Sequence, residues 1–202
     1  MANSIIKLTY LDLDGRGEII RLVLTFAGKA FKDIRISKED WPKFKLTAPL
    51  GQVPFVEIDG VVFSQSLAIA QYFAREFNLY GKTNLDGLEI DQISQITADF
   101  IQEFAKTFYE QDAVKKAEIS AQVAEKEVPR YIDHFEKLLQ KNGGEYFVGD
   151  SYTLADFIAY DVGTGFFKSY TQVALEKAPL LKALIEKIGN IEVIRAFKER
   201  HK

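Results

Sequence analysis

Tyr10 stands near the end of a short β-prone run, Lys7–Leu11, directly before a turn that contains Gly15 and Gly17. In open α/β sheets, ligands collect outside the carboxyl ends of the strands. A phenol at such a position can donate its hydroxyl proton to a developing anion. From the position alone, a half-buried strand aromatic is the more ordinary interpretation of this tyrosine.

Two later segments can present backbone groups to a ligand. The segment Gly51-Gln52-Val53-Pro54 enters a predicted strand. A cis Val53–Pro54 bond would turn the N–H and C=O of Val53 outward, whereas a trans proline at the first position of a strand is the commoner arrangement. Gln65-Ser66 marks a change from strand to helix, where unpaired N–H groups suit a carboxylate. Ser66 also fits the role of a simple helix N-cap.

One indole and two cations, Trp41, Lys45 and Arg16, lie in or near predicted loops. Each of them alone is typical of a solvated surface group. Together they could hold the carboxylates of a small acidic ligand.

Composition excludes several kinds of chemistry. The 202 residues contain no cysteine and only two histidines, His134 and His201. A protein thiol nucleophile, a disulfide and a zinc site with cysteine ligands are therefore impossible, and a histidine-rich metal site is not available. Any thiol chemistry must use a thiol that the ligand carries, and no metal is expected.

Charge and hydropathy indicate a soluble cytoplasmic protein. Lys and Arg number 26 against 29 Asp and Glu, so the net charge is −3 and no basic surface for nucleic acid is expected. No apolar run approaches the length of a membrane span. The first residues, Met1 to Lys7, are too polar and too short for a signal peptide.

Residues 1–80 read as a small mixed α/β domain in the order β-α-β-loop-β-β-α. The hairpin signal is Asp59-Gly60, and Gly28 stands where the first helix should stop. The predicted strands are 7–11, 31–36, 54–58 and 61–64, the predicted loop is 38–51, and the apolar helical stripes cover 19–27 and 69–77.

Residues 81–87 read as a linker and residues 88–202 as an all-helical domain of about five helices. The predicted helices include a long one with apolar residues from Ile93 to Phe108 and another over 115–141, which Pro129 should bend. Thr153-x-x-Asp156 has the form of a capping box, with Asp in place of the usual Glu or Gln.

An ordered set of motifs over essentially the whole chain resembles the glutathione S-transferases, and the sigma class most. That class includes invertebrate enzymes, glutathione-dependent prostaglandin D synthases and lens S-crystallins. The motifs are Lys7-Leu8-Thr9-Tyr10, Gly15-Arg16-Gly17-Glu18, Asp40-Trp41-Pro42 with Lys45, Gly51-Gln52-Val53-Pro54, Ser64-Gln65-Ser66-Leu67-Ala68-Ile69-Ala70 and Gly149-Asp150-Ser151-Tyr152-Thr153-Leu154-Ala155-Asp156.

The resemblance implies a thioredoxin-like N-terminal domain, an all-α C-terminal domain and glutathione as co-substrate. Tyr10 matches the catalytic tyrosine and Arg16 the arginine that tunes it. The remaining matches bind glutathione: Trp41 and Lys45 at the glycyl end, Gly51, Gln52, Val53 and the cis Pro54 along the cysteinyl backbone, and Gln65 and Ser66 at the γ-glutamyl group.

The same resemblance implies a homodimer, in which Asp99 reaches the γ-glutamyl amine held by the partner subunit. It implies conjugation of the glutathione thiolate to small hydrophobic electrophiles, with peroxide reduction as a further activity. Two alternatives remain: a glutathione-dependent prostaglandin isomerase, and a non-catalytic structural or ligand-binding protein like the S-crystallins. Residues that could line the electrophile pocket, and that fit a core equally well, are Leu11, Gly15, Phe104, Phe108 and Phe157.

The sequence departs from the family pattern in two places. Lys106 falls where the vertebrate prostaglandin synthases carry a tryptophan that packs the lipid, which counts against prostaglandin synthesis. The C-terminal segment, Phe197 to Lys202, is shorter than in many relatives, which implies a more open pocket.

Overall fold

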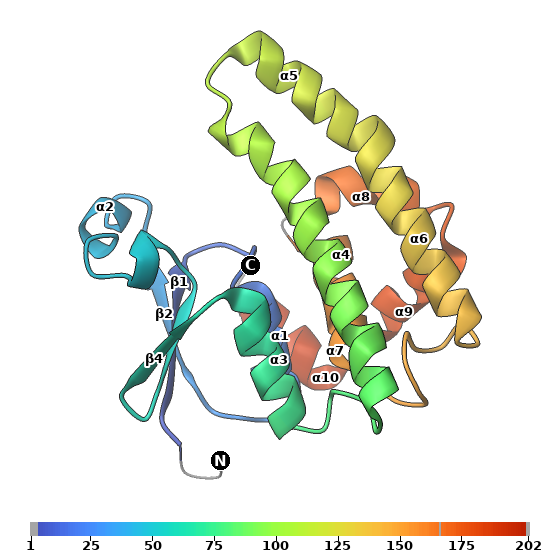
Figure 1. Ribbon diagram of the computed structural model, residues 1–202, viewed down its shortest axis with the longest axis horizontal. Helices are drawn as coiled ribbons and strands as arrows, with labels where there is room; N and C mark the ends of the chain where they lie inside the picture. The colour runs from blue at the N-terminus through green and yellow to red at the C-terminus, as the bar shows by residue number, and fades with distance from the viewer. Residues whose placement is uncertain (1–3, 166, 201–202) are drawn as a thin grey trace. The chain divides into compact units, whose positions relative to one another are not determined.

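The computed structural model describes residues 4–165 and 167–200, and their contacts form two compact units (Figure 1). The first unit runs up to Tyr80 and also includes the residues from Asn190 onward, and the second is Gly81–Gly189. The last helix therefore groups with the N-terminal residues, and not with the helices that precede it in the chain. The domain boundaries drawn from the sequence, at 80 and 88, stay a prediction.

The first unit is built on a four-stranded mixed sheet, which confirms the predicted thioredoxin-like architecture. The strand order is β2-β1-β3-β4, with β1 parallel to β2 and antiparallel to β3, and β3 antiparallel to β4. The strands are β1 (Ile6–Leu11), β2 (Lys32–Ile36), β3 (Phe55–Ile58) and β4 (Val61–Ser64). The β3–β4 turn has positive φ at both Asp59 and Gly60, as a two-residue Asp-Gly hairpin requires.

In the described part of this unit, the helices that accompany the sheet are α1 (Glu18–Phe26), α2 (Trp41–Phe44), α3 (Ser66–Glu76) and α10 (Glu192–Arg200). Helix α1 is buried on every side from Glu18 to Leu24, and Gly28, with φ of 63°, follows its end as predicted. The predicted loop 38–51 instead contains α2 and a 3₁₀ turn, Pro49–Gly51. These pieces are too short to produce a readable hydrophobic period.

The second unit is helical throughout its regular elements. They are α4 (Asn84–Tyr109), α5 (Ala113–Gln122), the π-helical segment Val123–Glu127, α6 (Val128–Lys141), α7 (Leu154–Thr164), α8 (Lys168–Leu175) and α9 (Pro179–Gly189). Helix α4 starts inside the predicted linker, where Thr83 and Asp86 form a capping box. Helix α8 was not expected, because only Thr171 and Leu175 of it are buried.

Where the sequence predicts one helix over 115–141 with a bend at Pro129, the structure has α5, the π-helical segment Val123–Glu127 and α6. Proline lacks an N–H and its ring collides with the preceding turn, so the helix widens just before it. Thr153 and Asp156 form the predicted capping box at α7, with the Thr153 N–H donating to Asp156 Oδ2 at 2.6 Å. Across 4–165 and 167–200, no helix has both the length and the apolar character needed to cross a membrane.

Candidate active site

Three of the predicted site segments of the first unit meet at one edge of the sheet. The register pairs Thr9 of β1 with Phe55 of β3, and Phe55 with Ser64 of β4. The residue that follows Thr9, the residue that precedes Phe55 and the residue that follows Ser64 therefore emerge at the same edge. These residues are Tyr10, Pro54 and Gln65, from three separate stretches of the sequence.

The Tyr10 hydroxyl is held by the turn that follows β1. The backbone N–H of Arg16 donates a hydrogen bond to it at 3.0 Å, and Tyr10 is only 7% exposed. A phenol oxygen that accepts one hydrogen bond can still donate its own proton, and the accepted bond polarises the hydroxyl and makes it a better donor. The donor belongs to the main chain of Arg16, and the residue as a whole is exposed.

Two glycines let the turn lie directly on the Tyr10 ring. A Cβ on Gly15 would be 2.9 Å from the Tyr10 hydroxyl, and a Cβ on Gly17 would be 2.5 Å from Tyr10 Cδ1. Gly15 also has φ of 128°, which side-chain-bearing residues rarely adopt. Sequence analysis placed both glycines in the turn after Tyr10 and suggested Gly15 as a pocket residue, but it missed their role in seating the tyrosine.

A buried arginine, Arg21, is hydrogen-bonded to the same turn. Arg21 is completely buried and donates to Asp33 (3.0 Å), to Glu18 (3.2 Å) and to the carbonyl of Leu13 (2.9 Å). Its guanidinium carbon lies 5.7 Å from the centroid of the Tyr10 ring. Sequence reasoning missed Arg21. A charged residue inside the apolar run Ile19-Ile20-Arg21-Leu22-Val23 indicates a buried side chain that must have a charged partner.

The start of α3 departs from what the sequence suggested. Ser66 is the first residue of the helix, and the N-cap position belongs to Gln65, with no side-chain capping bond. The simple N-cap role suggested for Ser66 is therefore wrong. Gln65 has φ of 76° and ψ of 100°, a sparsely populated conformation, and such outliers cluster at ligand sites. The first backbone N–H groups of α3 have no partners within the helix.

The Val53–Pro54 peptide bond is cis, which settles the choice that the sequence left open. Pro54 is buried, Val53 is half-buried and Gln52 is exposed. The segment lies directly before β3, at the edge that also carries Tyr10.

The loop between β2 and β3 brings Lys45 and Gly51 together. A Cβ on Gly51 would meet Lys45 Cε at 3.7 Å, so the lysine chain lies along this glycine. Lys45 is exposed directly after α2, and Trp41 opens that helix in a half-buried position.

Apart from Leu11, which is half-buried at the end of β1, the remaining sequence-predicted residues belong to the second unit. Asp99 is exposed on α4. Of the suggested electrophile-pocket residues, Phe157 is fully buried and Phe104 nearly so, whereas Phe108 is half exposed. Lys106 is exposed and paired with Glu103.

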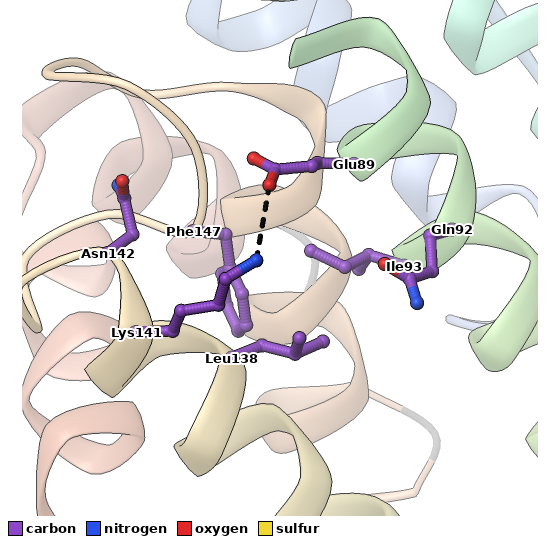
Figure 2. A pocket seen from close by; sticks show the side chains of 7 residues that line it. All are labelled: Glu89, Gln92, Ile93, Leu138, Lys141, Asn142 and Phe147. Carbon is purple, nitrogen blue, oxygen red and sulfur yellow. Dashed lines mark ion pairs between the residues drawn. The ribbon is translucent and has the colours of Figure 1, made fainter. Parts of the chain in front are cut away.

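A small hollow of about 60 Å³, open to solvent, lies between α4 and α6 (Figure 2). Apolar and polar side chains both line it, and Lys141 Nζ lies 3.6 Å from Glu89 Oε1 (Figure 2). The lining residues are Glu89, Gln92, Ile93, Leu138, Lys141, Asn142 and Phe147. None of the sequence-predicted site residues lines this hollow.

Comparison with known proteins gives one consistent family. Residues 6–75 match the N-terminal domain of glutathione S-transferases and residues 98–201 match their C-terminal domain. The chain is 37% identical to hematopoietic prostaglandin D synthase of Gallus gallus over 194 residues, which cover 96% of this chain and 95% of the relative. It is 39% identical to glutathione S-transferase 1 of Ascaris suum over 158 residues, 77% of each chain.

A solved structure of prostaglandin synthase D from Nilaparvata lugens superposes with a TM-score of 0.91. It is 32% identical to this chain, and the match covers 98% of both chains.

Proposed function

This chain belongs to the glutathione S-transferase family, with relatives among the nematode enzymes and the prostaglandin D synthases, and we propose that its Tyr10 stabilises the thiolate of bound glutathione. The family uses glutathione as a co-substrate. The thiolate formed at Tyr10 attacks the electrophilic carbon of a small hydrophobic molecule. The carbon–sulfur bond forms as the leaving group departs or the double bond accepts the electron pair.

The observation that carries this proposal is the hydrogen bond from the Arg16 N–H to the Tyr10 hydroxyl. A free thiol has a pKa of about 8.5, so only a small fraction is ionised at neutral pH. A hydrogen bond donated to the sulfur favours the thiolate and lowers that pKa. The thiol proton leaves to solvent, and the phenol keeps its own proton throughout.

The rest of the site orients the tripeptide in this proposal. The γ-glutamyl carboxylate lies at the start of α3 against Gln65 and Ser66, where backbone N–H groups favour an anion. The cysteinyl backbone pairs with Val53, beside Gln52 and Pro54. Lys45 and Trp41, with the backbone of Gly51 beside them, hold the glycyl end, and Arg16 adds positive charge near the sulfur.

We propose that the protein acts as a homodimer, as members of the family typically do. Three consecutive apolar side chains of the edge strand β4 support this: Val61, Val62 and Phe63 are 57%, 46% and 49% exposed. An exposed apolar edge strand is a liability unless another surface covers it. In such a dimer, Asp99 reaches the γ-glutamyl amine in the site of the partner subunit.

Replacing Tyr10 by phenylalanine tests the catalytic assignment. We expect kcat for a generic aromatic electrophile to fall about 10²-fold, because one hydrogen bond to the sulfur is lost. The KM for glutathione should stay within about twofold, because binding rests on other groups. Tyr72→Phe is the matched control, since its side chain is 39% exposed on α3. Equal turnover by Tyr10→Phe and the wild type at neutral pH would refute the proposal.

A second candidate function is isomerisation of a prostaglandin endoperoxide with glutathione as a true cofactor. The similarity to the Gallus gallus and Nilaparvata lugens synthases favours it. Lys106, exposed and paired with Glu103, stands where the vertebrate synthases are expected to carry a tryptophan. Incubating the purified protein with an endoperoxide and glutathione, and measuring prostaglandin D, separates the two functions.

A further inference from the structure

The last helix of the chain is tied to the turn that seats Tyr10. Helix α10 packs against α1 within the first unit (Figure 1). From α10, Lys198 Nζ reaches Glu18 Oε1 at 2.6 Å and Asp14 Oδ2 at 3.3 Å. Lys198 is thus bonded to both ends of the segment from Asp14 to Glu18.

This ion pair is shielded from water. The Glu18 side chain is 1% exposed and the Lys198 side chain is 20% exposed. A shielded pair is screened less by solvent and salt than a surface pair, and removing one partner leaves an uncompensated charge. Glu18 also accepts from Arg21 at 3.2 Å, so Lys198 extends the buried network beneath Tyr10 to the last helix.

The segment between these carboxylates is rich in glycine. It consists of Gly15, Arg16 and Gly17, and glycine has the most conformational freedom to lose on folding. The Arg16 N–H that donates to the Tyr10 hydroxyl lies at its centre. Without the cation, the Asp14 and Glu18 carboxylates would repel each other across the turn.

We propose that Lys198 is a positioning residue that fixes the Arg16 N–H against the Tyr10 hydroxyl. The inference rests on the proposed function, because it takes Tyr10 as the group that ionises glutathione. Lys198 acts through the turn and touches neither glutathione nor the electrophile. Its loss therefore alters the ionisation of the thiol and leaves the affinity for glutathione nearly unchanged.

The test compares the wild type with Lys198→Met and Lys198→Arg. In the ligand-free protein, hydrogen exchange of the Arg16 amide should be faster in Lys198→Met and close to wild type in Lys198→Arg. The pKa of bound glutathione, followed by thiolate absorbance, should rise by about 0.5–1 unit in Lys198→Met. At a pH below both values, kcat/KM should fall about 3–10-fold, with the KM for glutathione unchanged and with recovery in Lys198→Arg.

Two further variants keep the test decisive. Lys182→Met removes an exposed lysine–carboxylate pair, to Glu176 at 2.8 Å in the second unit, and should leave the thiol pKa unchanged. Asp14→Asn keeps the Glu18 pair and should shift the thiol pKa in the same direction by a smaller amount. It also serves if Lys198→Met does not fold.

The outcomes separate the two proposals. In the first outcome, the wild type and Lys198→Met lower the pKa of bound glutathione equally, and their Arg16 amides exchange at the same rate. This result overturns the role of Lys198 and leaves the proposed function standing. A wild-type protein that leaves the thiol pKa of glutathione at its solution value overturns the proposed function, and the positioning role fails with it.

Discussion

Replacing Gly17 by alanine should displace Tyr10, the proposed catalytic residue, without disturbing the backbone that carries the substitution. Gly17 has φ of −84° and ψ of −19°, which alanine adopts freely. The added Cβ would lie 2.5 Å from Cδ1 and 2.6 Å from Cγ of Tyr10. Because carbon atoms in contact are separated by about 3.5–4.0 Å, the ring must move by about 1 Å.

The size of the effect follows from this displacement. Overpacking of this kind costs about 1–3 kcal/mol of stability, and a displacement of about 1 Å in a catalytic group costs about 10²-fold in rate. We therefore expect kcat/KM for an aromatic electrophile to fall about 100-fold, while the KM for glutathione changes less than about threefold. The melting temperature should fall by roughly 3–10 °C.

Two controls isolate the cause. Gly189→Ala, at the end of α9, places its Cβ in ordinary contact with Tyr160 at 3.5 Å and should leave both quantities unchanged. Gly17→Ala in the Tyr10→Phe background should lose little further activity, because the hydroxyl is already absent. The reasoning is refuted if Gly17→Ala has wild-type kcat/KM. It is also refuted if Gly17→Ala lowers kcat/KM as much in the Tyr10→Phe background as in the wild type.

Two more predictions concern stability and assembly. Burial raises the pKa of Asp156 to about 6, above its unfolded value, although hydrogen bonds from Phe147 and Thr153 oppose the shift. The free energy of unfolding should therefore fall by about 3 kcal/mol as pH rises from about 4 to about 6, because the folded protein binds this proton more tightly than the unfolded chain. Urea denaturation should show this decrease in the wild type and not in Asp156→Asn. Light scattering should give twice 22.9 kDa, and Val62→Glu should shift the mass toward that of one subunit; a wild-type mass of one subunit would contradict the dimer.

The fold could be predicted because its signals are local. Strand β4 and the Asp59-Gly60 hairpin occur where the turn residues and the β-prone run Val61–Ser64 placed them. Helices α2 and α8 were not predicted, because four residues cannot show a period and because α8 buries only two side chains. The grouping of α10 with the N-terminal residues has no local signal at all, since its amphipathic pattern indicates a buried face and says nothing of what covers it.

The candidate site also has parts that the sequence predicts and parts that it does not. Its segments were predictable in order along the chain, because each combines a strand end with a residue of distinctive chemistry. The sheet register then brings Tyr10, Pro54 and Gln65 to one edge. The backbone N–H of Arg16 could not be predicted as the partner of the Tyr10 hydroxyl, since a sequence names side chains and this donor belongs to the main chain.

The support beneath the tyrosine shows why charged residues are the hardest part of a site to predict. Lys198 and Glu18 are 180 positions apart, and each alone is typical of a solvated helix surface. They become partners, with Glu18 buried and Lys198 half-buried, only because the chain returns to the first unit after Asn190. A network of this kind constrains Tyr10 through bonds that no motif around Tyr10 contains. Variants of the last helix are therefore expected to alter thiol ionisation while every residue of the glutathione motif is intact.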